Sequence, residues 1–253
     1  VLPLPNATPG APAPAPGAAR GPAAGRQHLL LWFVSNCGGA RAKLFQALKA
    51  LIPGDKLHVF GGCGPRSPCK SRKEKDPCMQ QLLSRYKFYA AFENSRCEGY
   101  ITEKFFRGLR FGMVPLALGG LSRADYEVLI SGDAFLHVDD FGSLQQLADR
   151  LLAIDKNDTE YNKFHAWRSR FKIDSGGNTA RAAYCELCER LHAPPGEQPP
   201  ARTFGGDLER WLFKDSCRKP GPAWAPQGAR RRLARWRRRH RRHRRTRRRR
   251  GDS

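Results

Sequence analysis

Short apolar runs alternate with amphipathic stretches along residues 28–170. The runs are too short for independent helices, so they predict strands, whereas apolar residues three or four positions apart predict helices. Leu44, Leu48 and Leu51, for example, fall on one helical face, and Pro53 then ends that helix. The pattern predicts strands at 28–34, 56–60, 86–92, 113–118 and 134–138, and helices at 40–52, 101–110, 143–154 and 158–170. This alternation favours an α/β fold with a doubly wound parallel sheet.

The two ends of the chain lack this pattern. Residues 1–27 are mostly Pro, Ala and Gly, which bury too little apolar surface to offset chain entropy, so we expect them to be disordered. Fifteen arginines lie between residues 230 and 250, and subtracting them from the net charge of +23 leaves +8. We therefore expect one domain at 28–217, followed by an Arg-rich disordered tail at 218–253. No apolar run approaches the roughly 20 residues of a membrane helix.

One short segment joins a strand, a polar turn and a helix start. Tyr86–Phe92 is rich in aromatic residues, the next seven residues (ENSRCEG) are polar apart from one cysteine, and Thr102 is placed to cap a helix whose first turn holds Glu103 and Lys104. Polar side chains thus gather at the carboxyl end of a strand, where open α/β sheets bind ligands and helix N-termini attract anions. An ordinary loop and capped helix with an exposed ion pair would give the same pattern.

Residues 86–107, YKFYAAFENSRCEGYITEKFFR, resemble the donor-binding motif YKFYxxFENSxxxDYxTEKxxR of the α1,3-fucosyltransferases. LWFVSNCGGAR at 31–41 resembles the strand and phosphate-proximal turn of this family, and FGGCGPRSPC resembles the cysteine segment of its core-type members. MVPLALGG, DAFLHVDDFGS, LLAIDKN, CELC and DLERWLFKDSC follow in the order of the family, so the resemblance covers residues 28–217. Gly99, Gly108 and ALGG depart from the common pattern. The resemblance implies the C-terminal, Rossmann-like half of a GT-B glycosyltransferase.

The resemblance also implies a reaction, in which L-fucose passes from GDP-β-L-fucose to a GlcNAc hydroxyl of a glycan, in α1,3 linkage and with inversion. The expected partners are GDP-fucose and an N-glycan or other GlcNAc-containing acceptor. No cofactor is strictly required, and a divalent cation is expected at most to stimulate. Full-length relatives are type II membrane proteins of the Golgi lumen, so the anchor and the acceptor half are expected to be missing here. The general base is expected in that acceptor half, since Asp139 and Asp140 are more typical of a structural motif, and the chain alone should transfer little or nothing.

Cationic side chains are expected to stabilise the diphosphate in place of a metal. The candidates are Arg41 and Lys104, although an arginine or lysine near a helix start is usually solvated. Ser35 and Asn36 follow a predicted strand, where small polar side chains can reach a phosphate or sugar, or simply cap the next helix.

Four further positions of the motif are expected to line the nucleotide-sugar pocket: Tyr89, Asn94, Tyr100 and Glu103. Glu103 suits the ribose hydroxyls as a bidentate acceptor. Tyr89 is equally consistent with an aromatic residue of the core.

The eight cysteines, with sequons at Asn6 and Asn157, fit an oxidising secretory compartment. Cys185 and Cys188 form a CxxC that does not follow the first strand of a thioredoxin-like unit. We expect structural disulfides there, with cysteines of the absent half among the possible partners.

Three cysteines, at 63, 69 and 78, crowd one loop. A disulfide among them, or from one of them to Cys37 or Cys97, is expected, but the connectivity stays open. A zinc site is the competing interpretation, and the absence of paired CxxC spacing disfavours it.

Two other functions fit the same residues. The arginine run at 230–250 would bind nucleic acid by counterion release, with Trp236 as one stacking surface. It lacks helical periodicity and a nucleic-acid fold beside it, so nothing supplies specificity and nucleic acid is not expected as a partner. The second alternative is a donor-binding pseudoenzyme that regulates another protein.

Overall fold

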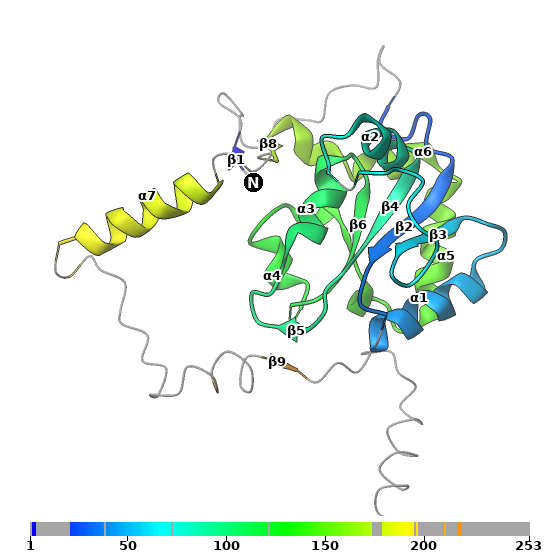
Figure 1. Ribbon diagram of the computed structural model, residues 1–253, viewed down its shortest axis with the longest axis horizontal. Helices are drawn as coiled ribbons and strands as arrows, with labels where there is room; N and C mark the ends of the chain where they lie inside the picture. Colours follow the sequence, from blue (N-terminus) through cyan, green and yellow to red (C-terminus); the bar gives the residue numbers. More distant parts are fainter. Residues whose placement is uncertain are drawn as a thin grey trace, which may run out of the picture.

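The computed structural model describes residues 2–3, 21–37, 39–71, 73–120, 122–173, 179–194, 196, 210 and 217–218. Its centre is a five-stranded parallel sheet with strand order β3-β2-β4-β6-β7 (Figure 1). The strands are β2 (His28–Val34), β3 (Leu57–Gly61), β4 (Tyr86–Phe92), β6 (Val114–Leu118) and β7 (Leu136–His137). The α/β fold expected from the sequence is confirmed. The direction of the strand order reverses between β2 and β4, and ligands of open α/β sheets bind at such a point.

Helices cover both faces of the sheet. On one face lie α1 (Ala40–Leu51), α5 (Leu144–Asp155) and α6 (Asp158–Lys163). On the other lie α2 (Pro77–Ser84), α3 (Glu103–Arg110) and α4 (Ala124–Glu127). All seven residues of β4 are buried: Phe88, Ala90 and Phe92 pack toward α1 and α5, whereas Tyr89 and Ala91 pack toward α2 and α3. Alternate side chains of a central strand thus serve two separate cores, which is why six of its seven residues are apolar or aromatic, Lys87 being the exception.

Shorter elements complete the described chain. Three 3₁₀ helices span Gly132–Ala134, Val138–Asp140 and Ala166–Ser169. Two small antiparallel pairs join β1 (Leu2–Pro3) to β8 (Phe171–Lys172), and β5 (Arg96–Cys97) to β9 (Cys217–Arg218). Helix α7 (Thr179–His192) lies apart from the sheet in Figure 1. Within the described residues, no helix is both long and apolar enough to cross a membrane.

Two predicted elements are wrong in extent. The strand predicted at 134–138 is only Leu136–His137, because 3₁₀ turns flank it on both sides. The helix predicted at 158–170 ends at Lys163 and resumes as a 3₁₀ turn. Tyr161 packs in the core on the α1 and α5 side, whereas Trp167 packs in the core on the α2 and α3 side. One straight helix cannot place both rings, so the chain turns between them.

The packed region begins before the predicted boundary at residue 28. Ala23 is buried, and its N–H donates to the Asn162 side-chain oxygen over 3.0 Å. The Arg26 guanidinium donates to the carbonyl of Phe111 over 3.1 Å and to the carbonyl of Tyr86. Leu2–Pro3 also lies within the segment expected to be disordered, and it pairs with β8. The arginine run at 230–250 lies outside the described residues.

Gly108 lets α3 lie close to the sheet. A Cβ atom at this position would lie 3.0 Å from Cγ of Pro115 in β6 and 3.4 Å from Cβ of Tyr89 in β4. Glycine inside a helix costs about 1 kcal/mol relative to alanine, but a side chain here would push α3 away from both strands. The close approach sets the position of the first turn of α3, where Glu103 and Lys104 lie.

The burial of His165 should make the protein less stable in acid. Burial, followed by the charges of Arg168 and Arg26, lowers the pKa of His165 from 6.5 to about 3. The unfolded chain therefore binds more protons than the folded one below pH 6.5, and stability falls as the pH drops from there toward 3, by up to about 1.4 kcal/mol per pH unit. Urea unfolding at about pH 7 and about pH 4.5 measures this loss. His165→Gln, which keeps an acceptor for Arg168, should lose less stability, and an equal loss in both proteins would contradict this assignment.

Candidate functional site

A cavity of about 390 Å³ opens at the carboxyl ends of β2, β3 and β4. Its walls combine strand ends, the turn after β2, the start of α3 and the segment that leads into α2. The lining residues are Phe33, Val34, Ser35, Asn36, Arg41, Phe60, Gly61, Glu74, Met79, Asn94, Glu103, Lys104 and Arg107. The cavity thus lies at the reversal of strand order between β2 and β4, where this class of sheet binds ligands.

Six of the eight residues predicted to bind the donor line this cavity: Ser35, Asn36, Arg41, Asn94, Glu103 and Lys104. They come from three separate segments of the chain, and the fold brings them together. Tyr89 and Tyr100 are not among the lining residues. The N–H of Tyr100 donates to the carbonyl of Cys97 over 3.1 Å, which closes a turn in the loop after β4.

Tyr89 lies beneath the cavity wall. It is fully buried, and its hydroxyl accepts a hydrogen bond from the Arg107 guanidinium over 3.2 Å. Burial raises the pKa of Tyr89, although the charge of Arg107 acts in the opposite direction. Tyr89 is therefore the core aromatic residue that the sequence also allowed, and its hydroxyl binds a cation that lines the cavity.

Lys104 is held by a buried carboxylate. Its ammonium lies 3.0 Å from Oε2 of Glu93, whose side chain is 1% exposed, and 3.3 Å from Oε1 of Glu103. Lys104 also donates to the Thr102 hydroxyl over 2.7 Å. Burial alone would lower the pKa of Lys104, but the hydrogen bond and charge of Glu93, with Glu103, outweigh it and raise the pKa. The ammonium is therefore charged and fixed at the cavity wall.

Glu93 organises the start of α3. It accepts from the N–H of Thr102 over 2.8 Å and from the Thr102 hydroxyl over 2.8 Å and 2.9 Å. Thr102 is the N-cap residue, but its side chain makes no capping hydrogen bond to the helix, because its hydroxyl binds Glu93 instead. The expected Thr102 side-chain cap is therefore wrong. The carboxylate ties the end of β4 to the first turn of the helix.

The Arg41 guanidinium binds two backbone carbonyls, which the sequence did not indicate. Its guanidinium donates to the carbonyl of Phe92 at the end of β4 and to the carbonyl of Asn36 in the turn after β2, each over 3.0 Å. Burial lowers the pKa of Arg41, against the charge of Glu93. Arg41 thus joins the two strands that flank the reversal of strand order, and it is also one of the residues that line the cavity.

Glu103 is an exposed carboxylate at the same wall. Burial would raise its pKa, but hydrogen bonds from Thr102 and Lys104 outweigh this and lower the pKa. A carboxylate of low basicity accepts hydrogen bonds from hydroxyl groups well and removes protons poorly.

Sequence reasoning missed three charged residues of the site and its surroundings. Glu93 lies inside the quoted motif, and its position between an apolar strand and a polar turn was an available signal. Glu74 and Arg107 line the cavity and bind each other, with Nε of Arg107 2.8 Å from Oε1 of Glu74. Burial opposes the charge on Arg107, but Tyr89 and Glu74 outweigh burial and raise its pKa. No local pattern indicated Glu74, because its partners lie on α3.

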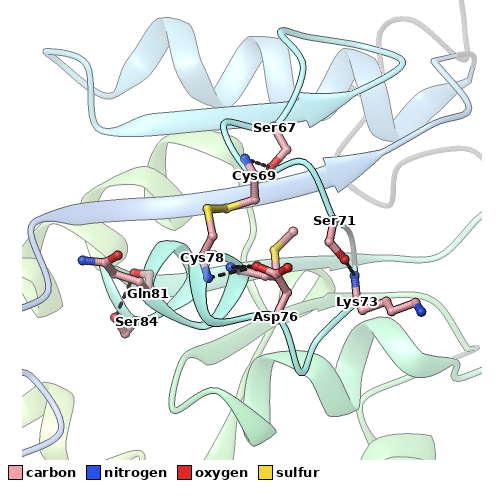
Figure 2. The surroundings of a disulfide bond; sticks show 9 residues. Ser67, Cys69, Ser71, Lys73, Asp76, Cys78, Gln81 and Ser84 are labelled. Carbon is pink, nitrogen blue, oxygen red and sulfur yellow. Dashed lines mark hydrogen bonds between the residues drawn. A yellow bond between two sulfur atoms is a disulfide. The ribbon is translucent and has the colours of Figure 1, made fainter.

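Disulfides fix the loops around the cavity. Cys37–Cys63 joins the turn after β2 to the loop after β3, Cys69–Cys78 joins that loop to α2 (Figure 2), and Cys97–Cys217 joins β5 to β9. The first pairing is among those that the sequence left open, and so is the second. The third uses Cys97 but a partner outside the predicted set. All six of these cysteines are in disulfides, so none of their thiols is free to bind zinc, and the zinc interpretation loses its ligands.

The remaining cysteines and the sequons lie away from the cavity. Cys185 and Cys188 are exposed on α7 and are free within the described structure, so the disulfides expected there stay a prediction. Asn157 is exposed, and its side chain caps α6 by accepting from the N–H of Glu160 over 3.0 Å. Asn6 lies outside the described residues.

Comparison with known proteins gives the family. Residues 23–211 match the family model described as "Glycosyltransferase family 10 (fucosyltransferase) C-term". The chain belongs to glycosyltransferase family 10. The resemblance stated from the sequence is therefore confirmed. Within the family, this chain is 38% identical over 194 residues to α-(1,3)-fucosyltransferase 7 of Mus musculus, covering 76% of this chain and 45% of that protein.

Other similarities extend across animals and to solved structures. The family 10 chain is 38% identical over 181 residues to glycoprotein 3-α-L-fucosyltransferase A of Drosophila melanogaster, covering 71% of this chain and 34% of the relative. Its fold is similar to a crystal structure of α1,3-fucosyltransferase with GDP-fucose, with a TM-score of 0.50, 18% identity, and coverage of 69% and 49% of the two chains. The chain therefore spans about half the length, or less, of these relatives.

Proposed function

We propose that this family 10 chain is the donor-binding half of an α1,3-fucosyltransferase and holds GDP-fucose in the cavity between β2, β4 and α3. One observation carries the proposal: six separately predicted donor-binding residues converge on a single cavity at the reversal of strand order. The family and the related structure with GDP-fucose support it. The family supports the substrate class, and the cations that line the cavity suit a nucleotide diphosphate.

The leaving group of fucosyl transfer is GDP, whose diphosphate gains negative charge as the glycosidic bond breaks. Lys104 supplies a fixed positive charge, and Arg41 adds a second cation at the cavity wall. Because Glu93 and the backbone carbonyls hold these groups before the donor arrives, they need no reorganisation during the reaction. We propose that these side chains do the work of a bound metal, with Ser35 and Asn36 completing the phosphate contacts.

The ribose needs a hydrogen-bond acceptor, whereas the hydroxyl of the acceptor sugar needs a general base. Glu103 suits the ribose hydroxyls, because its low pKa keeps it an acceptor. That same low basicity makes it a poor general base for the GlcNAc hydroxyl. We propose that the base comes from outside this chain and that the acceptor is a glycan terminating in GlcNAc. Inversion would then follow from attack on the face of the fucose opposite the diphosphate.

The compartment is proposed on the same grounds. Three disulfides among the described residues require an oxidising environment, and the lumen of the Golgi provides one.

Calorimetry on the full chain tests the proposal. The chain should bind GDP-fucose and GDP, and a variant that lacks residues 219–253 should bind them with the same affinity, because Cys217 and the cavity are retained. The isolated chain should transfer little or no fucose to a GlcNAc-terminated acceptor, and addition of a separate acceptor half should restore transfer. Failure to bind GDP, or binding lost with the arginine run, would refute donor binding. Robust transfer by the chain alone would refute an external base.

A further inference from the structure

Glu74 has no place in the phosphate and ribose contacts proposed above, yet it lines the same cavity. We propose that the Glu74 carboxylate recognises the guanine base of the donor by accepting from its N1–H and 2-amino groups. This inference rests on the proposed function, since it names the selective contact of the same site. It makes the chain selective for guanine over other purines.

The cavity that Glu74 lines also has apolar side chains that suit a planar base. Phe33 and Phe60 are register partners in β2 and β3, their ring centroids lie 5.7 Å apart, and both line the cavity. Met79 of α2 adds a third apolar side chain. This part of the wall comes from β2, β3 and α2, whereas Lys104 belongs to the first turn of α3. The cavity thus offers an apolar region for the base that is separate from the cation at the start of α3.

The carboxylate is fixed by two arginines. Nε of Arg107 lies 2.8 Å from Oε1 of Glu74, and Nη1 of Arg110 contacts Oε2. The Glu74 side chain is 23% exposed, so it is neither a core residue nor a freely solvated one. An ionised carboxylate offers about four lone-pair sites. Each oxygen therefore keeps acceptor capacity after binding its arginine.

Guanine is the purine that matches two side-by-side acceptor oxygens. Its Watson–Crick edge presents N1–H and the 2-amino group as adjacent donors. Adenine has no N1–H, and hypoxanthine has N1–H but no 2-amino group. A carboxylate held in place distinguishes these bases by the number of hydrogen bonds that each can donate. A site built to accept a given hydrogen bond strongly rejects an analogue that lacks the donor.

The loop that carries Glu74 is held at both ends. Cys69 and Cys78 are joined covalently, and Oδ1 of Asp76 accepts from the N–H groups of Cys78 and Met79 over 2.9 Å and 3.4 Å at the start of α2 (Figure 2). This places the carboxylate before any ligand binds, which lowers the entropic cost of recognition.

Calorimetry with three diphosphates on the full chain tests the inference. The wild-type chain should bind GDP about tenfold or more tightly than inosine diphosphate, which lacks the 2-amino group. Glu74→Gln should weaken GDP binding and strengthen binding of xanthosine diphosphate. The glutamine carbonyl still accepts from N1–H, and its amide donates to the carbonyl oxygen at C2 of xanthine. A residue that only supports the loop would not produce this gain.

Glu103→Gln is the matched control, because it changes a second carboxylate of the same cavity. It should weaken GDP, inosine diphosphate and xanthosine diphosphate alike, since all three share the ribose. Thermal unfolding shows whether each variant is folded, and the wild-type comparison of GDP with inosine diphosphate needs no variant. A wild-type chain that does not bind GDP overturns the proposed function and this inference together. Binding of GDP without preference over inosine diphosphate, or Glu74→Gln without any gain for xanthosine diphosphate, overturns the role of Glu74 alone.

Discussion

Replacing Glu93 with alanine is expected to lower the free energy of unfolding by about 3 to 5 kcal/mol, the range for removing one partner of a buried ion pair. The carboxylate is 1% exposed and binds the backbone N–H and hydroxyl of Thr102 as well as the ammonium of Lys104. Its loss removes the acceptor of both Thr102 donors and one of the partners of Lys104, and it detaches the first turn of α3 from β4. Chemical denaturation measured with the wild-type protein under the same conditions gives the difference.

Glu98→Ala is the matched control for this experiment, because Glu98 is exposed in the same loop after β4. It should leave the free energy of unfolding nearly unchanged. Glu93→Gln keeps the shape and one acceptor oxygen but not the charge, so its stability should fall between wild type and Glu93→Ala. Equal stability of Glu93→Ala and Glu98→Ala would show that the carboxylate does not hold α3.

Replacing Lys104 with methionine is expected to raise the dissociation constant for GDP roughly 10- to 100-fold, as loss of one charge-assisted bond to phosphate predicts. Methionine keeps most of the aliphatic stem that packs in the wall and removes the ammonium. Because the lost contact is ionic, the difference between wild type and variant should shrink as salt is added. Calorimetry at two salt concentrations measures both effects.

Lys156→Met provides the comparison, since Lys156 is an exposed lysine at the end of α5, away from the cavity. It should bind GDP as the wild type does. A Lys104→Met variant that is folded and binds GDP with wild-type affinity would place the diphosphate elsewhere in the cavity.

Most of the sheet could be predicted because its strands are locally distinct. β4 has six apolar or aromatic residues among its seven, with Lys87 as the exception, and polar residues follow it, so the strand and its carboxyl end are recognisable in the sequence. The turn after β2 and the start of α3 were also recognisable as polar segments that follow strands. Their meeting in one cavity follows from parallel pairing, since the carboxyl ends of neighbouring parallel strands lie on the same edge.

The parts that escaped prediction depend on contacts between distant residues. The helix at Pro77–Ser84 was missed, although Asp76 before a proline is a recognisable helix start. The position of Glu74 depends on a disulfide and on two arginines of α3, which no local pattern can reveal. Tyr89 was placed in the pocket by its motif, whereas its position in the alternation of β4 sends its side chain beneath the wall.

The link between Cys97 and Cys217 makes the intervening chain a covalent ring, since the two residues are 120 positions apart in sequence. A single protease cut anywhere within that ring, for instance in the exposed helix α7, breaks the backbone without releasing a fragment. The loop after β4, which carries Asn94 at the cavity, therefore keeps the far end of the domain attached even after nicking. Under oxidising conditions such a nicked protein retains its full mass, and only reduction separates its pieces.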